Sequence, residues 1–391
     1  MQSAIDQVNR CIQENLTAIR VVKSYVRGDY EVEKFGVVNE NLKSESEKAF
    51  GTAVLNMPAM QFVMYGTILG ILLIGGRLIN EGQMMIGQLT SFLSYVLLIL
   101  NSLMMMSNVF LLMTRSLASA ERIMEVIDEK IDITDENAKD IAVAKGEIEF
   151  DHMWFKYKDT AKEYVLSDVS FHIKPGQTVG IIGQTGSSKT TLVQLIPRLY
   201  DVTKGEVKID GINVKEYPVR HLRDAVAMVL QKNTLFSGSL IDNLRWGNEN
   251  ATLDEIKEAC QIACVDEFVD RLADGYDTEM GQEGVNVSGG QKQRICIARA
   301  ILKKPKVLIL DDSTSAVDTA TEAKIRSGLA EKLPDMTKII IAQRISSVRH
   351  ADQIIIMDRG HVEAIGTHES LLRDNQIYQE IYASQKEGAD L

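Results

Sequence analysis

The sequence predicts two membrane-spanning helices followed by a soluble α/β domain built on a mostly parallel sheet. Three features of the 391 residues predict this fold. Two long stretches without charge lie in the first third of the chain, and short apolar runs alternate with amphipathic helical runs after residue 146. A glycine-rich segment near residue 183 joins an apolar strand to a helix. A disordered chain is excluded, because 45% of the residues are hydrophobic.

The two uncharged stretches cover residues 49–76 and 82–114, which are 28 and 33 positions long. A helix needs about 20 apolar residues to cross the hydrocarbon core, so each stretch can span a membrane with some tilt. Buried helices of a soluble bundle are the alternative, but soluble cores rarely need uncharged stretches of this length. Lysines and arginines lie before the first stretch and after the second, so the positive-inside rule places both ends in the cytoplasm.

The remaining segments define the domain organisation. Residues 1–48 lack the apolar core and cleavage site of a signal peptide and predict a charged amphipathic helix that enters the membrane. Residues 77–83 predict a short turn between the spans, and the polar, aperiodic residues 131–146 predict a linker. A second domain follows over residues 147–391, in which apolar runs predict buried strands of a parallel sheet covered on both faces, among them residues 307–310 and 338–342.

Charge and cysteine content restrict the partners and the compartment. The net charge is −11, because 43 basic residues stand against 54 acidic ones, and this balance argues against a nucleic-acid partner. Four scattered cysteines are too few for a disulfide scaffold and match no zinc-binding pattern, which suggests a reducing compartment. Cys260 and Cys264 lie one helical turn apart, and we interpret them as core residues in preference to a redox pair.

A glycine-rich run from Ile181 to Thr191 follows an apolar strand and leads into a helix. This is the context of a phosphate-binding loop, in which backbone N–H groups and the helix N-terminus hold phosphate oxygens. Lys189 is expected to reach the β- and γ-phosphates, and the Thr190 hydroxyl to ligate Mg²⁺. Ser188 stands where the pattern has a second glycine, a departure of little consequence if its φ is negative. The candidate nucleotide-binding residues are Gly183, Thr185, Gly186, Ser187, Ser188, Lys189, Thr190 and Thr191.

Two further clusters carry candidate chemistry. Asp311 ends a buried strand, where a carboxylate can hold Mg²⁺ beside the phosphate loop, and Asp312 occupies the place of a general base. Ser288 precedes a glycine pair that heads a helix and offers hydroxyl and N–H groups to a second anion, although such a pair alone is more often a plain turn. The residues of this second candidate surface are Ser288, Gly289, Gly290 and Gln291.

In their order, these motifs resemble the C-terminal part of an ABC exporter half-transporter, in which a membrane domain is fused to a nucleotide-binding domain. Residues 183–190 resemble Walker A, residues 308–312 resemble Walker B, and residues 287–291 resemble the ABC signature. Taken alone, Tyr157 could be an ordinary strand aromatic and Gln231 a loop hydrogen-bonder. By the resemblance, Gln231 corresponds to the Q-loop glutamine, Tyr157 to the aromatic that stacks on adenine, Ser315–Asp318 to the D-loop, and residues 278–284 to a loop that contacts membrane helices.

The resemblance implies α-helical transmembrane segments followed by an α/β P-loop domain of the ABC type with a helical subdomain. Residues 1–130 would form a partial transmembrane domain, with a coupling segment at 14–35 and the last two of six transmembrane helices, so the chain is expected to be N-terminally truncated. ATP and Mg²⁺ are the implied cofactors, and the implied location is the plasma membrane, multi-pass, with the nucleotide-binding domain in the cytoplasm. The implied cargo is a small molecule, lipid or peptide, and the implied metal ligands are Thr190, Gln231 and Asp311.

Two positions besides Ser188 depart from the family pattern. The family usually has glutamate after the Walker B aspartate and histidine in the switch loop, whereas this chain has Asp312 and Gln343. Aspartate is shorter by one methylene, and glutamine cannot become cationic, so hydrolysis at this site is expected to be slow. With Gln231, these are the candidate catalytic residues. By the resemblance, the signature of one domain completes the ATP site of its partner. Because the signature of this chain is intact, the resemblance implies a heterodimer in which only one ATP site is degenerate. A non-hydrolysing regulatory subunit and a soluble ABC-type mechanoenzyme are the alternatives.

Overall fold

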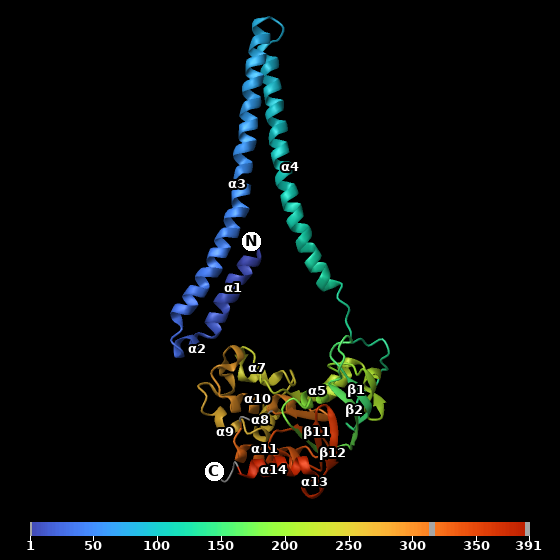
Figure 1. Cartoon of the computed structure of the whole chain (residues 1–391). Coiled ribbons are helices and arrows are strands. Elements are labelled where there is room, and N and C mark those ends of the chain that lie inside the picture. The colour runs from blue at the N-terminus through green and yellow to red at the C-terminus, as the bar shows by residue number, and fades with distance from the viewer. Residues whose placement is uncertain (1, 313–316, 388–391) are drawn as a thin grey trace. The chain divides into compact units, whose positions relative to one another are not determined.

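The computed structural model describes residues 2–312 and 317–387. The chain divides into two compact units, Met1–Lys130 and Ile131–Leu391. Figure 1 shows the first unit as helices only and the second as a mixture of strands and helices.

The first unit is a helical hairpin with a shorter helix beside it (Figure 1). The windows Pro58–Asn80 and Ile86–Met106 are long and apolar enough to cross a membrane, with 6% and 0% of their residues buried. Such exposure differs from that of a core helix in a soluble protein. The helices of this unit are α1 (Gln2–Thr17), α2 (Ile19–Ser24), α3 (Gly28–Asn80) and α4 (Ile86–Ile127).

Two details of this unit differ from the sequence-based expectation. The segment predicted as one helix is divided among α1, α2 and the start of α3. Between α2 and α3 the backbone leaves the helical region at Val26, which has a φ of 53°. The turn between the apolar helices is also later than predicted, since α3 continues to Asn80. A Cβ on Gly75 would lie 2.3 Å from Leu89 Cδ1, so this glycine permits the close approach of α3 and α4.

The second unit is built on a six-stranded sheet in which all neighbours are parallel except the edge pair β11–β12. This confirms the predicted parallel sheet. Alternate residues of its strands enter two hydrophobic clusters, with Leu308 and Ile340 on one face and Ile309 and Ile339 on the other. In sheet order the strands are β12 (His361–Gly366), β11 (Gln353–Asp358), β3 (Thr178–Gly183), β10 (Thr337–Ile341), β9 (Val307–Asp311) and β6 (Val226–Val229).

A separate antiparallel sheet covers one face of the parallel sheet. Phe150 and Val207 from this sheet share a cluster with Ile181 and Ile309 of the parallel one. The sequence predicted that the second domain starts at residue 147, but not that its first strands pair in a second sheet. In order, the strands are β2 (Leu166–Ile173), β1 (Ile148–Phe155), β4 (Lys204–Ile209) and β5 (Ile212–Asn213), and a small pair is formed by β7 (Gly238–Ser239) and β8 (Glu279–Met280).

Helices α7, α8 and α10 cover the other face, where α10 packs against α7 and α8. Cys260 and Cys264 are buried and free, which confirms their assignment to the core, and burial raises the pKa of Cys260 to about 12. The helices are α5 (Lys189–Gln194), α6 (Val219–Ala225), α7 (Leu240–Arg245), α8 (Leu253–Ile262), α9 (Asp266–Val269), α10 (Gly289–Leu302), α11 (Thr319–Lys332), α12 (Ile345–Val348), α13 (His368–Asp374) and α14 (Gln376–Glu387), with 3-10 turns at Val214–Glu216, Gly275–Asp277 and Gln282–Gly284.

The segment predicted as a linker, residues 131–146, contains no helix or strand. It is nevertheless fixed to the second unit. The backbone amides of Ala144 and Lys145 donate to Asp210 Oδ2 over 2.7 and 2.9 Å, and Val143 is buried. These contacts place the segment at the start of the second unit.

Candidate nucleotide site

The phosphate loop connects β3 to α5. Gly183 ends β3 where a Cβ would lie 2.1 Å from the carbonyl oxygen of Met357, so only glycine fits beside β11. Gly186 has a φ of 85°, which is readily adopted by glycine alone. Thr185 is exposed, and Ser187 is buried at 2% exposure. The predicted loop therefore has the backbone that a phosphate cradle requires.

Lys189, the first residue of α5, folds back over the loop. Its Nζ donates to the carbonyl oxygens of Gly183 and Gln184 over 2.9 and 2.8 Å. Burial lowers the pKa of Lys189, opposed by the charges of Asp311 and Asp312. The Lys189 ammonium group therefore lies at the loop, where a phosphate oxygen could replace the two backbone carbonyls as its hydrogen-bond partner.

Ser188 does not have the negative φ under which its replacement of glycine would be harmless. Its φ is 69° and its ψ is 22°, in the left-handed region. A residue with a Cβ is strained there by about 1–2 kcal/mol. The phosphate loop therefore stores strain at the position where the family pattern has glycine.

Thr190 and Asp311 meet at the carboxyl edge of the parallel sheet. The Thr190 hydroxyl donates to Asp311 Oδ1 over 3.1 Å, and Asp311 is only 2% exposed. Its Oδ2 atom is buried and has no hydrogen-bond partner among the described residues. Burial raises the pKa of Asp311, opposed by the Thr190 bond. An unsatisfied buried carboxylate oxygen next to a hydroxyl is a donor set that suits Mg²⁺, which prefers oxygen ligands.

Gln231, the third predicted metal ligand, lies two residues beyond β6 and is exposed. The strand β6 runs parallel to β9, so Gln231 follows the same edge of the sheet as Asp311. The two residues therefore lie at the same edge of the sheet, but no hydrogen bond joins their side chains among the described residues.

Asp312 and Gln343, which also depart from the family pattern, contact each other. Gln343 Nε2 donates to Asp312 Oδ2 over 2.8 Å. The strands β9 and β10 are neighbours, and the amide of Asp312 donates to the carbonyl of Ile341, which brings the two following turns together. Burial raises the pKa of Asp312, opposed by the Gln343 bond. Sequence reasoning selected both residues but could not show that they touch.

Tyr157 is held beside the phosphate loop with half of its surface exposed. Its hydroxyl lies 2.9 Å from Thr191 Oγ1 in α5. Its ring packs edge-on against Phe155 and Tyr200, with centroids 4.9 and 5.1 Å away. A fixed aromatic ring with a free face fits the predicted contact with a base.

The predicted signature heads α10. Ser288 is the N-cap, because its hydroxyl accepts from the amide of Gln291, and Gln291 Oε1 accepts from the amide of Ser288 over 2.8 Å. Gly289 is exposed and Gly290 is partly exposed, so their N–H groups face solvent at a helix N-terminus. The helix α10 packs against α7 and α8, whereas α5 packs against β3, so the two surfaces predicted to bind phosphate belong to different parts of the unit.

Two further features complete the surroundings of the site. Ser315 lies outside the described residues, whereas Asp318 is the N-cap of α11. Phe236 and Trp246, which sequence reasoning missed, stack at 4.1 Å and line a cavity of about 300 Å³ that also includes Leu230, next to Gln231. Both rings are exposed. The spacing of two aromatic residues in a sequence does not indicate that they stack on the surface, so this groove could be identified only from the fold.

A phosphate loop, a buried strand-end carboxylate and a capped glycine pair on a helical subdomain define an ATP-binding cassette domain. Residues 166–315 match the family model of the ABC transporter, and residues 1–103 match that of the ABC transporter transmembrane region. The chain belongs to the ABC transporter family. It combines a helical transmembrane region with an ABC nucleotide-binding domain, the arrangement of exporters.

Individual relatives agree with this assignment. The chain is 41% identical to the uncharacterized ABC transporter ATP-binding protein YfiB of Bacillus subtilis (strain 168), over 100% of this chain and 68% of the relative. It is 36% identical to the putative multidrug export ATP-binding/permease protein YgaD of the same organism, over 98% of this chain and 66% of the relative. A solved structure of a bacterial Atm1-family ABC exporter with ATP bound matches with a TM-score of 0.89 and 28% identity, over 98% of this chain and 69% of that chain. The chain thus spans about two thirds of the length of its relatives.

Proposed function

We propose that the chain is the ATP-binding and permease subunit of an ABC exporter. It couples the binding and hydrolysis of ATP at a dimer interface to the export of a small molecule, lipid or peptide across the plasma membrane. The observation that carries the proposal is the bond between Thr190 and Asp311 beside a buried carboxylate oxygen with no partner. The apolar surface of α3 and α4 supports a place in the membrane, and the relative named as a putative multidrug export protein supports export.

In this proposal, the nucleotide is held by residues that the fold has already gathered. Lys189 exchanges its backbone carbonyl partners for phosphate oxygens, and Tyr157 presents its free ring face to adenine. Thr190 and Asp311 hold Mg²⁺, with Gln231 at the same edge. The metal supplies charge neutralisation at the phosphates when it is bound.

The same site is poorly equipped for cleavage. The Asp312 carboxylate is about 1.5 Å shorter in reach than a glutamate, and its Oδ2 already accepts a hydrogen bond from Gln343. Removal of a positioned base typically lowers a rate by about 10²–10⁴. We therefore infer a degenerate site that binds ATP and hydrolyses it slowly.

The intact signature leads to a heterodimer. Ser288 and the glycine pair face solvent on the helical subdomain, away from the phosphate loop of their own unit. In a head-to-tail pair, this surface completes the ATP site of a second half-transporter that has its own glutamate and histidine. ATP then stabilises the closed pair over the open one, which is the differential binding that any conformational switch requires. The coupling segment that contains α2 is our candidate for passing closure to the membrane helices.

ATPase measurements on the purified full chain, alone and with its neighbouring half-transporter, test the proposal. We expect little turnover by the chain alone and much more by the pair. In the pair, Ser288→Ala should remove most of the turnover, because it damages the competent site, whereas Asp312→Ala should have little effect. Fast turnover by this chain alone that Asp312→Ala leaves unchanged would refute the degenerate site.

The contact between Asp312 and Gln343 also favours a second candidate, a regulatory subunit without hydrolysis. This candidate applies if the partner lacks its own catalytic base. The same assay separates the two functions, because a pair that binds ATP and releases no phosphate is regulatory.

A further inference from the structure

The turn after β10 carries Gln343 and leads directly into α12, whose start is not capped from within. The first N–H groups of a helix have no partner inside it, and the N-cap Arg344 makes no side-chain hydrogen bond to α12. The amide of Ile345 donates instead to Gln385 Oε1 over 2.8 Å. A residue of the last helix, α14, thus caps the first turn of α12.

The same side chain holds the other side of this turn. Gln385 Nε2 donates to the backbone carbonyl of Gln343 over 2.8 Å. A carboxamide has an acceptor and a donor on one carbon, so it can bind an N–H and a C=O group together. Ile345 is buried and its bond to Gln385 is part-buried, whereas the bond to the Gln343 carbonyl is exposed to solvent. The backbone on both sides of Arg344 is therefore clipped to α14 by a single side chain.

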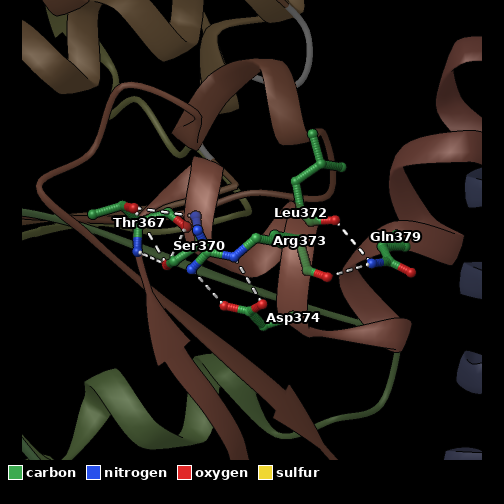
Figure 2. Close-up of polar contacts among 6 residues, drawn as sticks. All are labelled: Thr367, Ser370, Leu372, Arg373, Asp374 and Gln379. Carbon is green, nitrogen blue, oxygen red and sulfur yellow. Dashed lines mark hydrogen bonds and ion pairs between the residues drawn. The ribbon is translucent and has the colours of Figure 1, made fainter.

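The helix α14 is itself fixed to the unit. Figure 2 shows Gln379 reaching from α14 to the end of α13, where its Nε2 donates to the carbonyls of Leu372 and Arg373 over 2.9 and 3.1 Å. These are terminal helix carbonyls, which need partners from outside their own helix. Tyr378 is fully buried, and its hydroxyl lies 2.7 Å from His368 Nδ1. Gln385 therefore extends from a helix that is anchored one to two turns earlier.

We propose that Gln385 is a positioning residue of the nucleotide site: it fixes the backbone of Gln343, so that the Gln343 amide stays at Asp312 and beside the terminal phosphate of bound ATP. The link runs from α14 through the backbone of the turn to the Gln343 side chain. This inference rests on the proposed function, because it concerns how long the same site retains ATP.

The test uses the full-length chain copurified with its partner and loaded with radiolabelled ATP and Mg²⁺. Gln385→Leu removes both hydrogen bonds, and Gln385→Glu keeps an acceptor for the Ile345 amide but loses the donor. We expect ATP release from this chain's site to accelerate about two- to tenfold with Gln385→Leu, the effect of one or two modest hydrogen bonds. Gln376→Leu is the matched control, because Gln376 donates to Glu380 within α14.

Two additional readouts separate positioning from general damage. Hydrogen exchange at the Ile345 amide should become faster with Gln385→Leu and stay slow with Gln385→Glu, whether or not ATP is present. In a Gln343→Ala background, Gln385→Leu should no longer change ATP release, because the side chain through which it acts is gone.

Three outcomes overturn the inference alone, and a fourth overturns it together with the proposed function. Unchanged exchange at Ile345 in Gln385→Leu would mean that the clip does not form. Faster exchange with unchanged ATP release would make the clip structural only, and an equal effect in the Gln343→Ala background would mean that it does not act through Gln343. A wild-type complex that retains no ATP at this site contradicts the proposed function itself, and the inference falls with it.

Discussion

The nucleotide site has two halves that differ in how their polar groups are satisfied. In the binding half, Thr190 donates to one carboxylate oxygen of Asp311, and the other, buried oxygen has no hydrogen-bond partner among the residues that the structure describes. In the cleavage half, Asp312 and Gln343 bond to each other. A buried unsatisfied oxygen costs free energy unless a ligand completes it, whereas a bonded pair needs no ligand. This difference is the basis of our proposal that the site holds a metal–nucleotide complex and cleaves it slowly.

The largest expected effect comes from rebuilding the cleavage half. In a pair whose partner has lost its own catalytic base, Asp312→Glu combined with Gln343→His should raise ATP turnover by about a hundredfold or more, because a positioned base contributes about 10²–10⁴. Phosphate release measures the change. The single variants are controls and should each give less than the double variant. If the double variant shows no gain, the deficit lies elsewhere, for example at Ser188.

The second prediction disables the binding half. Asp311→Asn should weaken Mg²⁺-dependent ATP binding by about 10- to 100-fold, the equivalent of losing a charged interaction of about 1.5–3 kcal/mol. Without nucleotide, the melting temperature should not fall, because burial disfavours the charge of Asp311 and raises its pKa. Asp374→Asn, which changes a surface partner of Arg373 (Figure 2), is the matched control. Equal binding by Asp311→Asn and wild type would remove the metal site.

The sequence predicted the strands and turns of the site because each has a local signal. The run at 307–310 is continuously apolar and ends in aspartate, which indicates a buried strand ending at a polar edge. The antiparallel sheet had no such signal. Its strand β4 begins with three exposed residues, Lys204, Gly205 and Glu206, so its apolar content is too low to be recognised, and alternation does not specify which strands pair.

Contacts between distant segments were beyond the sequence for a different reason. Asp312 and Gln343 are 31 residues apart and meet because β9 and β10 are neighbours in the sheet, a property of topology. Gln385 is 42 residues from Gln343, on a helix whose place depends on the packing of Tyr378. The φ of Ser188 could not be read from the sequence either, because a serine gives no sign of a left-handed backbone.

The third prediction concerns the strain within the binding half. Ser188→Gly should increase the free energy of unfolding by about 0.5–1 kcal/mol, since it relieves left-handed strain at some cost in unfolded-state entropy. A domain of this size should then melt about 1–4 °C higher. Gly186→Ala is the matched control with the opposite sign, because it adds a Cβ at a φ of 85°. An unchanged melting temperature in both variants would mean that the loop adopts another backbone in solution.

The smallest expected effect separates the two roles of Tyr157. Tyr157→Phe keeps the ring between Phe155 and Tyr200 and removes only the hydroxyl that lies 2.9 Å from Thr191 Oγ1. If the ring face contacts the base, ATP affinity should fall by less than about threefold, because a single partly exposed hydrogen bond is weak and acts only through the orientation of the ring. Equilibrium titration with ATP and Mg²⁺ measures this change against wild type. A loss of affinity as large as that of Asp311→Asn would contradict this expectation. It would show that nucleotide binding depends on the hydrogen bond between the Tyr157 hydroxyl and Thr191 in α5, and not on the ring face.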